Sequence, residues 1–241
     1  SRPRRFGKSL LVSTLEAYFR GKKELFEELA MERLEQEWDA YPVLHIDFSL
    51  TKYTEVSELT GQLNLFLSRW EEEYGKNEAE KTAAERLQGI LMRAYRQTAK
   101  PVVVLIDEYD APLLDSNSDV ALQQQLRTEM RKFFSPLKGL GQYLRFLFIT
   151  GISKFSQMSI FSELNNLQNI SMRDDFSALC GITENELLTV LKPDIERMAQ
   201  ANGETYEEAC AHLKRRYDGY HFSKQCEDIY NPFSLFNAFN A

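Results

Sequence analysis

An unbroken apolar run constrains the fold of this chain most strongly. Residues 102–106 (VVVLI) follow Pro101 and end abruptly in the acids Asp107 and Glu108. Consecutive β-branched and aliphatic residues without polar alternation are typical of a strand buried on both faces, as in a parallel sheet covered by helices. Carboxylates that close such a strand lie where open α/β sheets bind their ligands. The run therefore predicts an α/β domain with a ligand site beside Asp107.

The first residues of the chain point to an anionic ligand. Gly7, Lys8 and Ser9 lead directly into a helical pattern. In a phosphate-binding loop, backbone N–H groups and the lysine hold the phosphates, and the hydroxyl ligates Mg²⁺. We expect Lys8 and Ser9 to have these roles at the positive end of the helix dipole. Arg2 stands where the general motif has its first glycine, and the alternative is a basic arm that only caps a surface helix.

The acids after the apolar run fit the same chemistry. Asp107 would hold Mg²⁺ directly or through water, and Glu108 would act as the general base that polarises the attacking water. The alternative is that both acids only solubilise the end of a strand. A further apolar run, residues 144–149, ends in Thr150. We expect Thr150 to contact the γ-phosphate or the water as a sensor, with Ser153 and Lys154 in reserve; the alternative is a hydroxyl that caps a loop or helix.

Phosphoryl transfer also needs positive charge near the transferred group. Arg173 follows the sensor strand and is the candidate for a mobile arginine. The alternative for Arg173 is a plain ion pair with Asp174 or Asp175. Arg4 and Arg5 are expected to serve the phosphates from within the loop.

Six segments together resemble a known family. They are SRPRRFGKSLL at 1–11, LIDEYDAP at 105–112, FITGISKFS at 148–156, LCGITENEL at 179–187, YDGYHFS at 217–223 and YNPFSL at 230–235. In this order they are similar to the bacterial AAA-ATPase-like family, in which Arg2 is usual in the loop. The resemblance implies a P-loop ATPase module, commonly followed by a PD-(D/E)XK nuclease-like domain. The implied nucleotide-binding residues are Arg4, Arg5, Phe6, Gly7, Lys8, Ser9 and Leu10, and the implied metal ligands are Ser9 and Asp107.

The periodicity of the chain predicts its organisation. We expect an ATPase core over residues 1–178, with a mostly parallel sheet flanked by helices, and a small helical lid over 179–241. A further strand is expected over 43–49, and helices over 22–38, 56–74, 82–99, 122–134, 183–198 and 206–217. His45 is expected as a hydrogen-bonded core histidine, and His221 as a structural turn residue rather than an adenine contact.

Composition limits the classes of protein. The net charge of −7 argues against a surface that binds nucleic acid throughout, although Arg2, Arg4 and Arg5 leave local contacts open. Three cysteines without metal-ligand spacing favour a reducing cytoplasm and no disulfide. No apolar run approaches the roughly 20 residues that cross a bilayer. Because the chain begins next to the loop, we expect the preceding strand to lie outside it and nucleotide affinity to be weakened.

These observations predict an ATP-binding, Mg²⁺-dependent ATPase that works as a nucleotide-driven switch or motor. Two alternatives remain open. One is a non-hydrolysing nucleotide-binding or protein-interaction scaffold, and the other is an ATPase that regulates a fused nuclease domain. The pattern distinguishes neither ATP from GTP nor one protein partner or oligomeric state from another.

Overall fold

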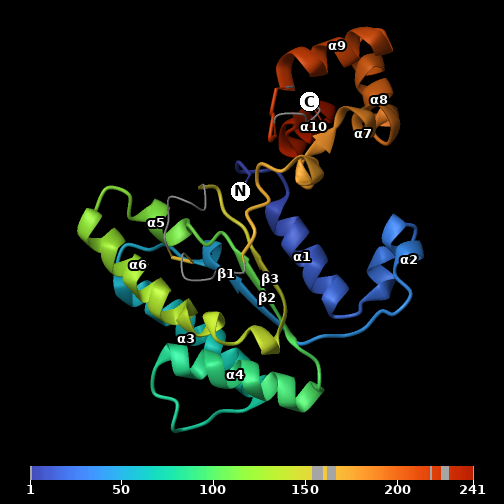
Figure 1. The fold of residues 1–241 in the computed structure, drawn as a ribbon. Coiled ribbons are helices and arrows are strands. Elements are labelled where there is room, and N and C mark those ends of the chain that lie inside the picture. The colour runs from blue at the N-terminus through green and yellow to red at the C-terminus, as the bar shows by residue number, and fades with distance from the viewer. Residues whose placement is uncertain (1, 154–159, 162–166, 218, 224–227, 241) are drawn as a thin grey trace. The chain divides into compact units, whose positions relative to one another are not determined.

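The computed structural model describes residues 2–153, 160–161, 167–217, 219–223 and 228–240 (Figure 1). Their internal contacts divide the chain into two compact units. One unit is Ser9–Leu167, and the other joins Ser1–Lys8 to Gln168–Ala241. The expected domain boundary between residues 178 and 179 stays a prediction.

A three-stranded parallel sheet forms the centre of the unit Ser9–Leu167. Its strands are β1 (Val43–Asp47), β2 (Val102–Asp107) and β3 (Leu144–Ile149), in the order β1-β2-β3. The register pairs Asp47 with Asp107 and Ile106 with Ile149, so all three strands end at one edge. The expected α/β class with a parallel sheet is confirmed, and the strand that ends before Thr150 lies beside the acidic strand.

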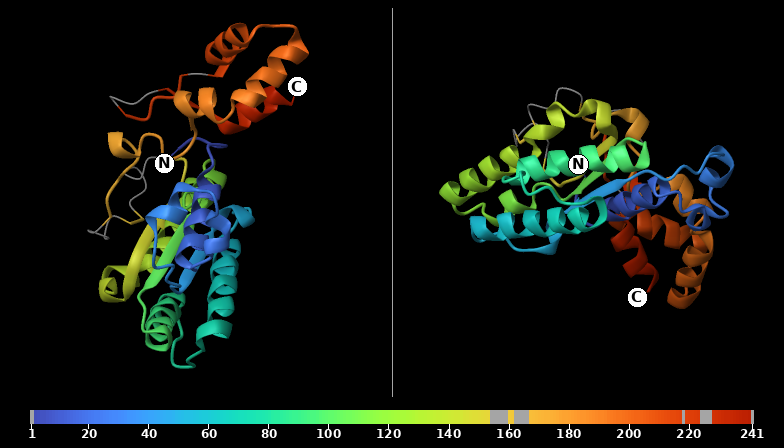
Figure 2. Two further views of the ribbon diagram at one scale, coloured as in Figure 1. Left: turned by 90° about the vertical axis from the view of Figure 1, so that its right-hand side faces the viewer. Right: turned by 90° about the horizontal axis from the view of Figure 1, so that it is seen from below.

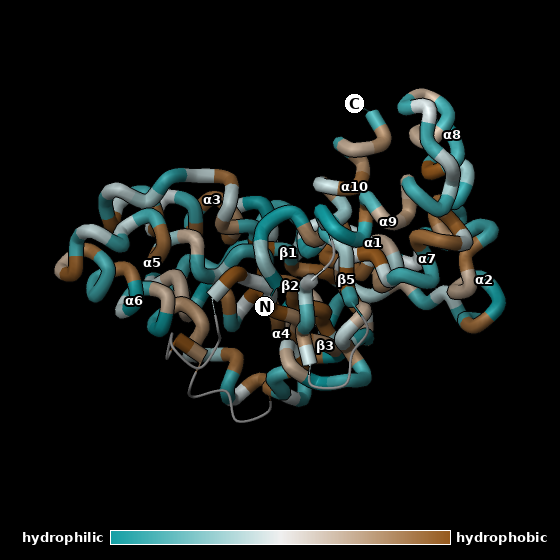
Figure 3. The backbone as a smooth tube through the Cα atoms, turned by 90° about the horizontal axis from the view of Figure 1, so that it is seen from above, coloured by the Kyte–Doolittle hydropathy of each residue, from teal (hydrophilic) through white to brown (hydrophobic). Residues whose placement is uncertain are grey.

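Helices cover both faces of this sheet (Figure 2). Val104 and Ile106 face α3 (Val56–Tyr74), α4 (Ala83–Thr98) and α6 (Val120–Phe134). Val103 and Leu105 face α1 (Lys8–Phe19), where Val12 and Phe19 are buried. Every residue of β2 is buried, which explains why its sequence lacks polar alternation. In Figure 3 hydrophobic colouring accordingly follows β2 and β3.

Short elements complete this unit. They are η1 (Lys23–Phe26), α2 (Ala30–Leu34), η2 (Phe48–Leu50), α5 (Ala111–Asp115), η3 (Ser135–Lys138) and η4 (Gly141–Tyr143). The expectation of one helix over residues 22–38 is wrong. Glu28 has φ 65° between η1 and α2, and this left-handed backbone conformation interrupts a right-handed helix.

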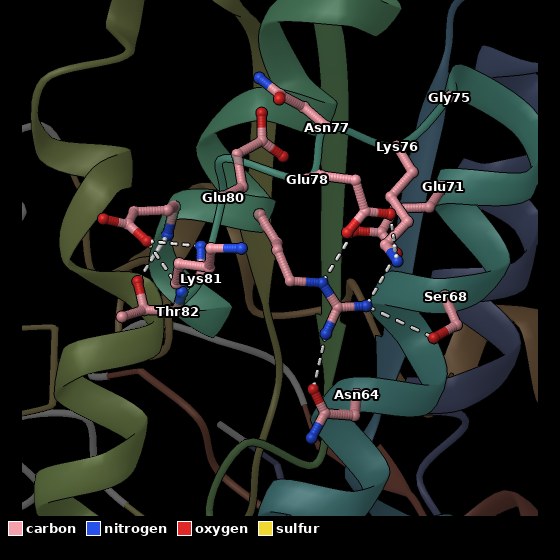
Figure 4. Close-up of polar contacts among 12 residues, drawn as sticks. Asn64, Ser68, Glu71, Gly75, Lys76, Asn77, Glu78, Glu80, Lys81 and Thr82 are labelled. Carbon is pink, nitrogen blue, oxygen red and sulfur yellow. Dashed lines mark hydrogen bonds and ion pairs between the residues drawn. The ribbon is translucent and has the colours of Figure 1, made fainter.

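Polar contacts join α3 to α4 (Figure 4). The guanidinium of Arg86 on α4 donates two hydrogen bonds to the carboxylate of Glu71 on α3, at 2.7 and 2.8 Å. It donates a third to Asn64 at 2.7 Å. Because a planar guanidinium matches a carboxylate with two parallel bonds, Arg86 fixes the lateral position of the two helices.

The C-terminal region is helical around a small two-stranded ladder. Its elements are η6 (Asp174–Phe176), β4 (Ile182–Thr183), α7 (Glu184–Thr189), α8 (Lys192–Asn202), α9 (Tyr206–Tyr217), β5 (Ile229–Tyr230) and α10 (Pro232–Phe239). Thr183 and Glu186 form a capping box at the start of α7. The single helix expected over residues 183–198 is wrong, because Pro193 lies in the first turn of a new helix and offers no N–H to continue α7.

None of the helices in the described ranges has both the length and the apolar character needed to cross a bilayer.

Candidate functional site

Helix α1 runs antiparallel to the sheet strands. The carbonyl of Phe19, at the end of α1, accepts a hydrogen bond at 2.7 Å from the N–H of Tyr41, just before β1. Glu16 contacts His45 in the middle of β1. A helix rises about 1.5 Å per residue, so Ser9 lies roughly 15 Å back from Phe19, about one strand length. The start of the Ser9–Phe19 segment is therefore level with the carboxyl edge, where Asp107 lies.

Asp107 and Thr150 are brought together at that edge. Asp107 is 2% exposed, and its Oδ1 accepts hydrogen bonds from the hydroxyl of Thr150 and from the N–H of Glu108. The backbone ladder continues past the strands, because Thr150 N–H bonds to Ile106 at 2.8 Å and Tyr109 N–H bonds to Thr150 at 3.0 Å. The residues predicted as metal ligand and sensor thus share a charge-assisted hydrogen bond.

The predicted general base has an unusual backbone. Glu108 has φ 47°, in the left-handed region that non-glycine residues rarely adopt. This turn directs the N–H of Glu108 to the Asp107 carboxylate at 3.0 Å. Such strain costs of order 1–3 kcal/mol and is concentrated at functional sites, where the surrounding structure holds it in place.

Asp110 is a residue of this edge that sequence reasoning did not single out. It is fully buried, and its Oδ2 accepts hydrogen bonds from the amides of Ile152 and Ser153 at 2.8 and 2.5 Å. Ser153 thus enters the network through its backbone. The acidic run 107–110 is visible in the sequence, but nothing in that pattern indicates which backbone segment the last carboxylate binds.

The predicted phosphate-binding loop curls back on itself. Gly7 has φ 86° and Arg5 has φ 67°, both in the left-handed region. The ammonium of Lys8, which is 6% exposed, donates to the carbonyl of Pro3 at 3.0 Å. Left-handed turns of this kind aim successive N–H groups into a concavity that suits anions. The hydrogen bond to Pro3 therefore holds the Lys8 ammonium against the loop that precedes it.

The residues before Lys8 pack against the C-terminal helical region, within one compact unit. Phe6 is 1% exposed, with its ring centroid 4.8 Å from that of Tyr220 and 5.3 Å from that of Phe222. The guanidinium of Arg2 lies 4.0 Å from the centroid of the Phe222 ring and donates to the carbonyl of Phe176 at 2.8 Å. We call residues 2–7 the arm; aromatic and carbonyl contacts from the C-terminal region hold it.

The other arginines of the prediction have protein partners. Arg5 stacks on Phe233, with its guanidinium carbon 3.9 Å from the ring centroid. The carbonyl of Arg4 accepts a hydrogen bond from Asn231 at 3.5 Å. Arg173 is exposed and bonds to Asp175 at 2.7 Å, which is the ion pair that the sequence left as the alternative. Its role as a mobile arginine stays a prediction.

Four further residues of the prediction have different outcomes. His45 is partly buried and hydrogen-bonded to Glu16, as expected. His221 is exposed and pairs with Asp228 at 2.7 Å, which fits a structural turn residue. Leu10 is exposed at the start of α1. Lys154 lies outside the described residues.

The chemistry of the donors fits Mg²⁺ with a phosphate ligand. Over the described ranges, no group of three His, Cys, Asp or Glu side chains forms a ready-made metal site. Mg²⁺ needs no such cage, because it usually combines one or two protein oxygens with phosphates and waters. The Ser9 hydroxyl and the Asp107 carboxylate are oxygen donors of the kind that it prefers.

Comparison with known proteins identifies the group to which this architecture is related. The profile of a family described as "Predicted AAA-ATPase" matches residues 1–161. A protein of Azotobacter chroococcum mcd 1, described as "Uncharacterized protein in vnfD 5'region", is 34% identical over 242 residues. That alignment covers 99% of this chain and 44% of the relative, so the chain spans less than half of the relative's length. No solved structure matches the chain.

Proposed function

The chain belongs to the predicted AAA-ATPase family, and from this premise we propose that it binds ATP with Mg²⁺ and hydrolyses the γ-phosphate as a nucleotide-driven switch. The hydrogen bond between Thr150 and Asp107 beside the strained backbone of Glu108 is the observation that carries the proposal. It joins the ends of two neighbouring parallel strands at the edge where such sheets bind ligands.

The proposed roles follow from the chemistry of each group. Lys8 and the N-terminal amides of α1 bind the phosphates, and Ser9 and Asp107 hold Mg²⁺. The bound metal supplies positive charge that neutralises the phosphate oxygens. Thr150 orients the Asp107 carboxylate by donating its hydroxyl hydrogen bond to Oδ1. Glu108 accepts a proton from the attacking water.

Hydrolysis can be tested with two variants of the full chain. We expect Glu108→Gln to lower phosphate release by about 100-fold or more while ATP affinity changes little, because only proton transfer is lost. Lys8→Ala should weaken ATP binding itself. Lys132→Ala is the matched control, since Lys132 is an exposed lysine paired with Glu129 on α6. ATP binding without phosphate release by the wild type would indicate a non-hydrolysing binder, and equal release by wild type and Glu108→Gln would refute the role of Glu108.

The switch is supported by the contacts of the arm. Phe6 and Arg2 connect the loop that contains Lys8 to residues 171–177 and 220–222. A ligand shifts a conformational equilibrium only by its differential affinity for the two states. Nucleotide contacts that move the Lys8 ammonium away from the Pro3 carbonyl would change the conformation of the arm. The conformation of the segments that contact the arm would then change with it.

Hydrogen exchange can test this coupling. We expect ATP with Mg²⁺ to change amide protection in residues 171–177. Phe222→Ala, which removes the surface under Arg2 and one ring beside Phe6, should abolish that change while ATP still binds. Phe236→Ala is the control, because Phe236 is an exposed phenylalanine of the same region. Unchanged protection in the ATP-bound wild type would exclude the switch.

A further inference from the structure

The buried Asp110 side chain does not cap the helix that it precedes. It stands at the N-cap position of α5, where an aspartate ordinarily accepts a hydrogen bond from the first turn, but its side chain makes no such cap. Its Oδ2 instead accepts the amides of Ile152 and Ser153, more than 40 residues along the chain. Local capping therefore does not account for this carboxylate.

The contact leaves no space for a side chain at residue 151. A Cβ built on Gly151 would lie 2.6 Å from Asp110 Oδ1 and 2.5 Å from a ring carbon of Tyr109. Since real Cβ atoms essentially never approach other atoms so closely, the segment after β3 reaches Asp110 only because residue 151 is glycine.

Burying the Asp110 side chain has a free-energy cost that its hydrogen bonds do not fully offset. Its Oδ1 is buried and has no hydrogen-bond partner among the residues that the structure describes. A carboxylate in this position loses hydration and regains only the two amide bonds at Oδ2. An apolar residue of similar size would avoid this cost, so the stability of the fold does not by itself account for a carboxylate here.

We propose that Asp110 is a positioning residue of the proposed ATPase, which holds the segment Thr150–Ser153 against the acidic end of β2. The inference rests on the proposed function. The segment is held at three levels: Thr150 bonds to Asp107, the Thr150 carbonyl accepts from Tyr109, and Ile152 and Ser153 donate to Asp110. Without the last contact, the backbone after Thr150 loses its anchor, and the Thr150 hydroxyl no longer meets Asp107 in one fixed orientation.

The test compares three variants of the full chain. Asp110→Ala removes both acceptors, whereas Asp110→Asn keeps an oxygen that can accept the two amides and is the conservative rescue. Asp115→Ala is the control, because Asp115 is a carboxylate five residues on that bonds to Lys52 and to the backbone of Tyr53. Phosphate release, ATP affinity by calorimetry and amide exchange at residues 152 and 153 are measured for each.

We expect Asp110→Ala to lower kcat by about tenfold to a hundredfold, because a misplacement of about 1 Å has effects of this size. The Kd for ATP should stay within about threefold, and the amides of Ile152 and Ser153 should exchange faster. Asp110→Asn should retain most of kcat, and Asp115→Ala should leave kcat and both amides unchanged.

Two results would overturn the proposal. One is a wild-type kcat in Asp110→Ala, and the other is a loss of ATP affinity in proportion to kcat, which a purely structural role would produce. If Asp110→Ala does not fold, Gly151→Ala disturbs the same contact from the opposite side, and a wild-type kcat there would be equally decisive. If the wild type releases no phosphate, the proposed function fails, and amide exchange at 152 and 153 still decides whether Asp110 anchors the segment.

Discussion

Nδ1 of His45 lies 2.8 Å from Oε2 of Glu16, so a histidine–carboxylate pair joins the middle of β1 to α1. Arg20 bonds to the other oxygen of Glu16 at 2.9 Å. The hydrogen bond from His45 is the main reason that the pKa of Glu16 falls to about 2. The same bond raises the pKa of His45, and the negative charges of Asp47 and Asp107 add to the effect.

The pair predicts a pH dependence of stability. The pKa of Glu16 is lower in the folded state, so its contribution is present above pH 4.5 and is lost as the pH falls toward 2. The pKa of His45 is raised, so its contribution is complete below pH 6.5 and is lost as the pH rises through the folded-state pKa. We expect the pair to be most stabilising between these limits.

Urea unfolding at pH 5.5 and pH 8.5 can check this expectation. His45→Gln should cost more at pH 5.5 than at pH 8.5, with a difference on the order of 1 kcal/mol for a partly exposed pair. His212→Gln is the control, since His212 pairs with Glu204 on the surface and does not join α1 to the sheet. An equal cost of His45→Gln at both pH values would contradict the linkage.

The contact between α3 and α4 predicts a large effect of one arginine. Arg86 and Glu71 are nearly buried, so Arg86→Met leaves the Glu71 carboxylate without its bidentate partner. We expect a loss of about 2–4 kcal/mol in the free energy of unfolding, because removing one partner of a buried pair is strongly destabilising. The double variant Arg86→Met with Glu71→Leu should recover much of the loss. Additive costs of the two substitutions would show that the pair is not coupled.

The fold was predictable where buried apolar residues recur at the spacing of a strand or a helix. The three sheet strands were found within two residues of their ends, because β1, β2 and β3 are apolar runs that helices cover. Helices α3 and α9 were found with their bounds, because each has an apolar stripe at helical spacing. The breaks at Glu28 and before Pro193 were missed, since a stripe that continues across a turn resembles one helix.

The site was predictable only in part, for a related reason. Strand ends bring Asp107 and Thr150 together, and the lengths of two apolar runs are enough to predict that approach. The partners of Asp110 and of the arm depend on tertiary packing between distant segments, which periodicity does not encode. The buried packing of Phe6 shows the difference, because its neighbours in sequence are arginines and glycine.

The arm predicts a stability effect outside any helix or strand. Phe6 is buried between the rings of Tyr220 and Phe222, so Phe6→Ala should cost about 3–5 kcal/mol, the usual range for a buried phenylalanine. Phe6→Leu keeps most of the apolar volume and should cost less. Calorimetric unfolding of both variants beside Phe236→Ala, a half-exposed ring, measures the effect. A cost for Phe6→Ala no larger than that for Phe236→Ala would show that the arm is loosely held.

The left-handed backbone of Glu108 predicts that stability and activity separate at this residue. Asparagine enters the left-handed region at lower cost than glutamate, so Glu108→Asn should leave stability unchanged or raise it by up to about 1 kcal/mol. The same change removes the proposed base, and phosphate release should fall by about 100-fold or more. Ala99, with φ 54° at the C-cap of α4, provides the matched control. Ala99→Gly should stabilise the chain by about 1 kcal/mol for the same steric reason and leave phosphate release intact. If Glu108→Asn instead destabilised the chain by several kcal/mol, the glutamate would be a structural support of the turn, and its unusual backbone would no longer argue for catalysis.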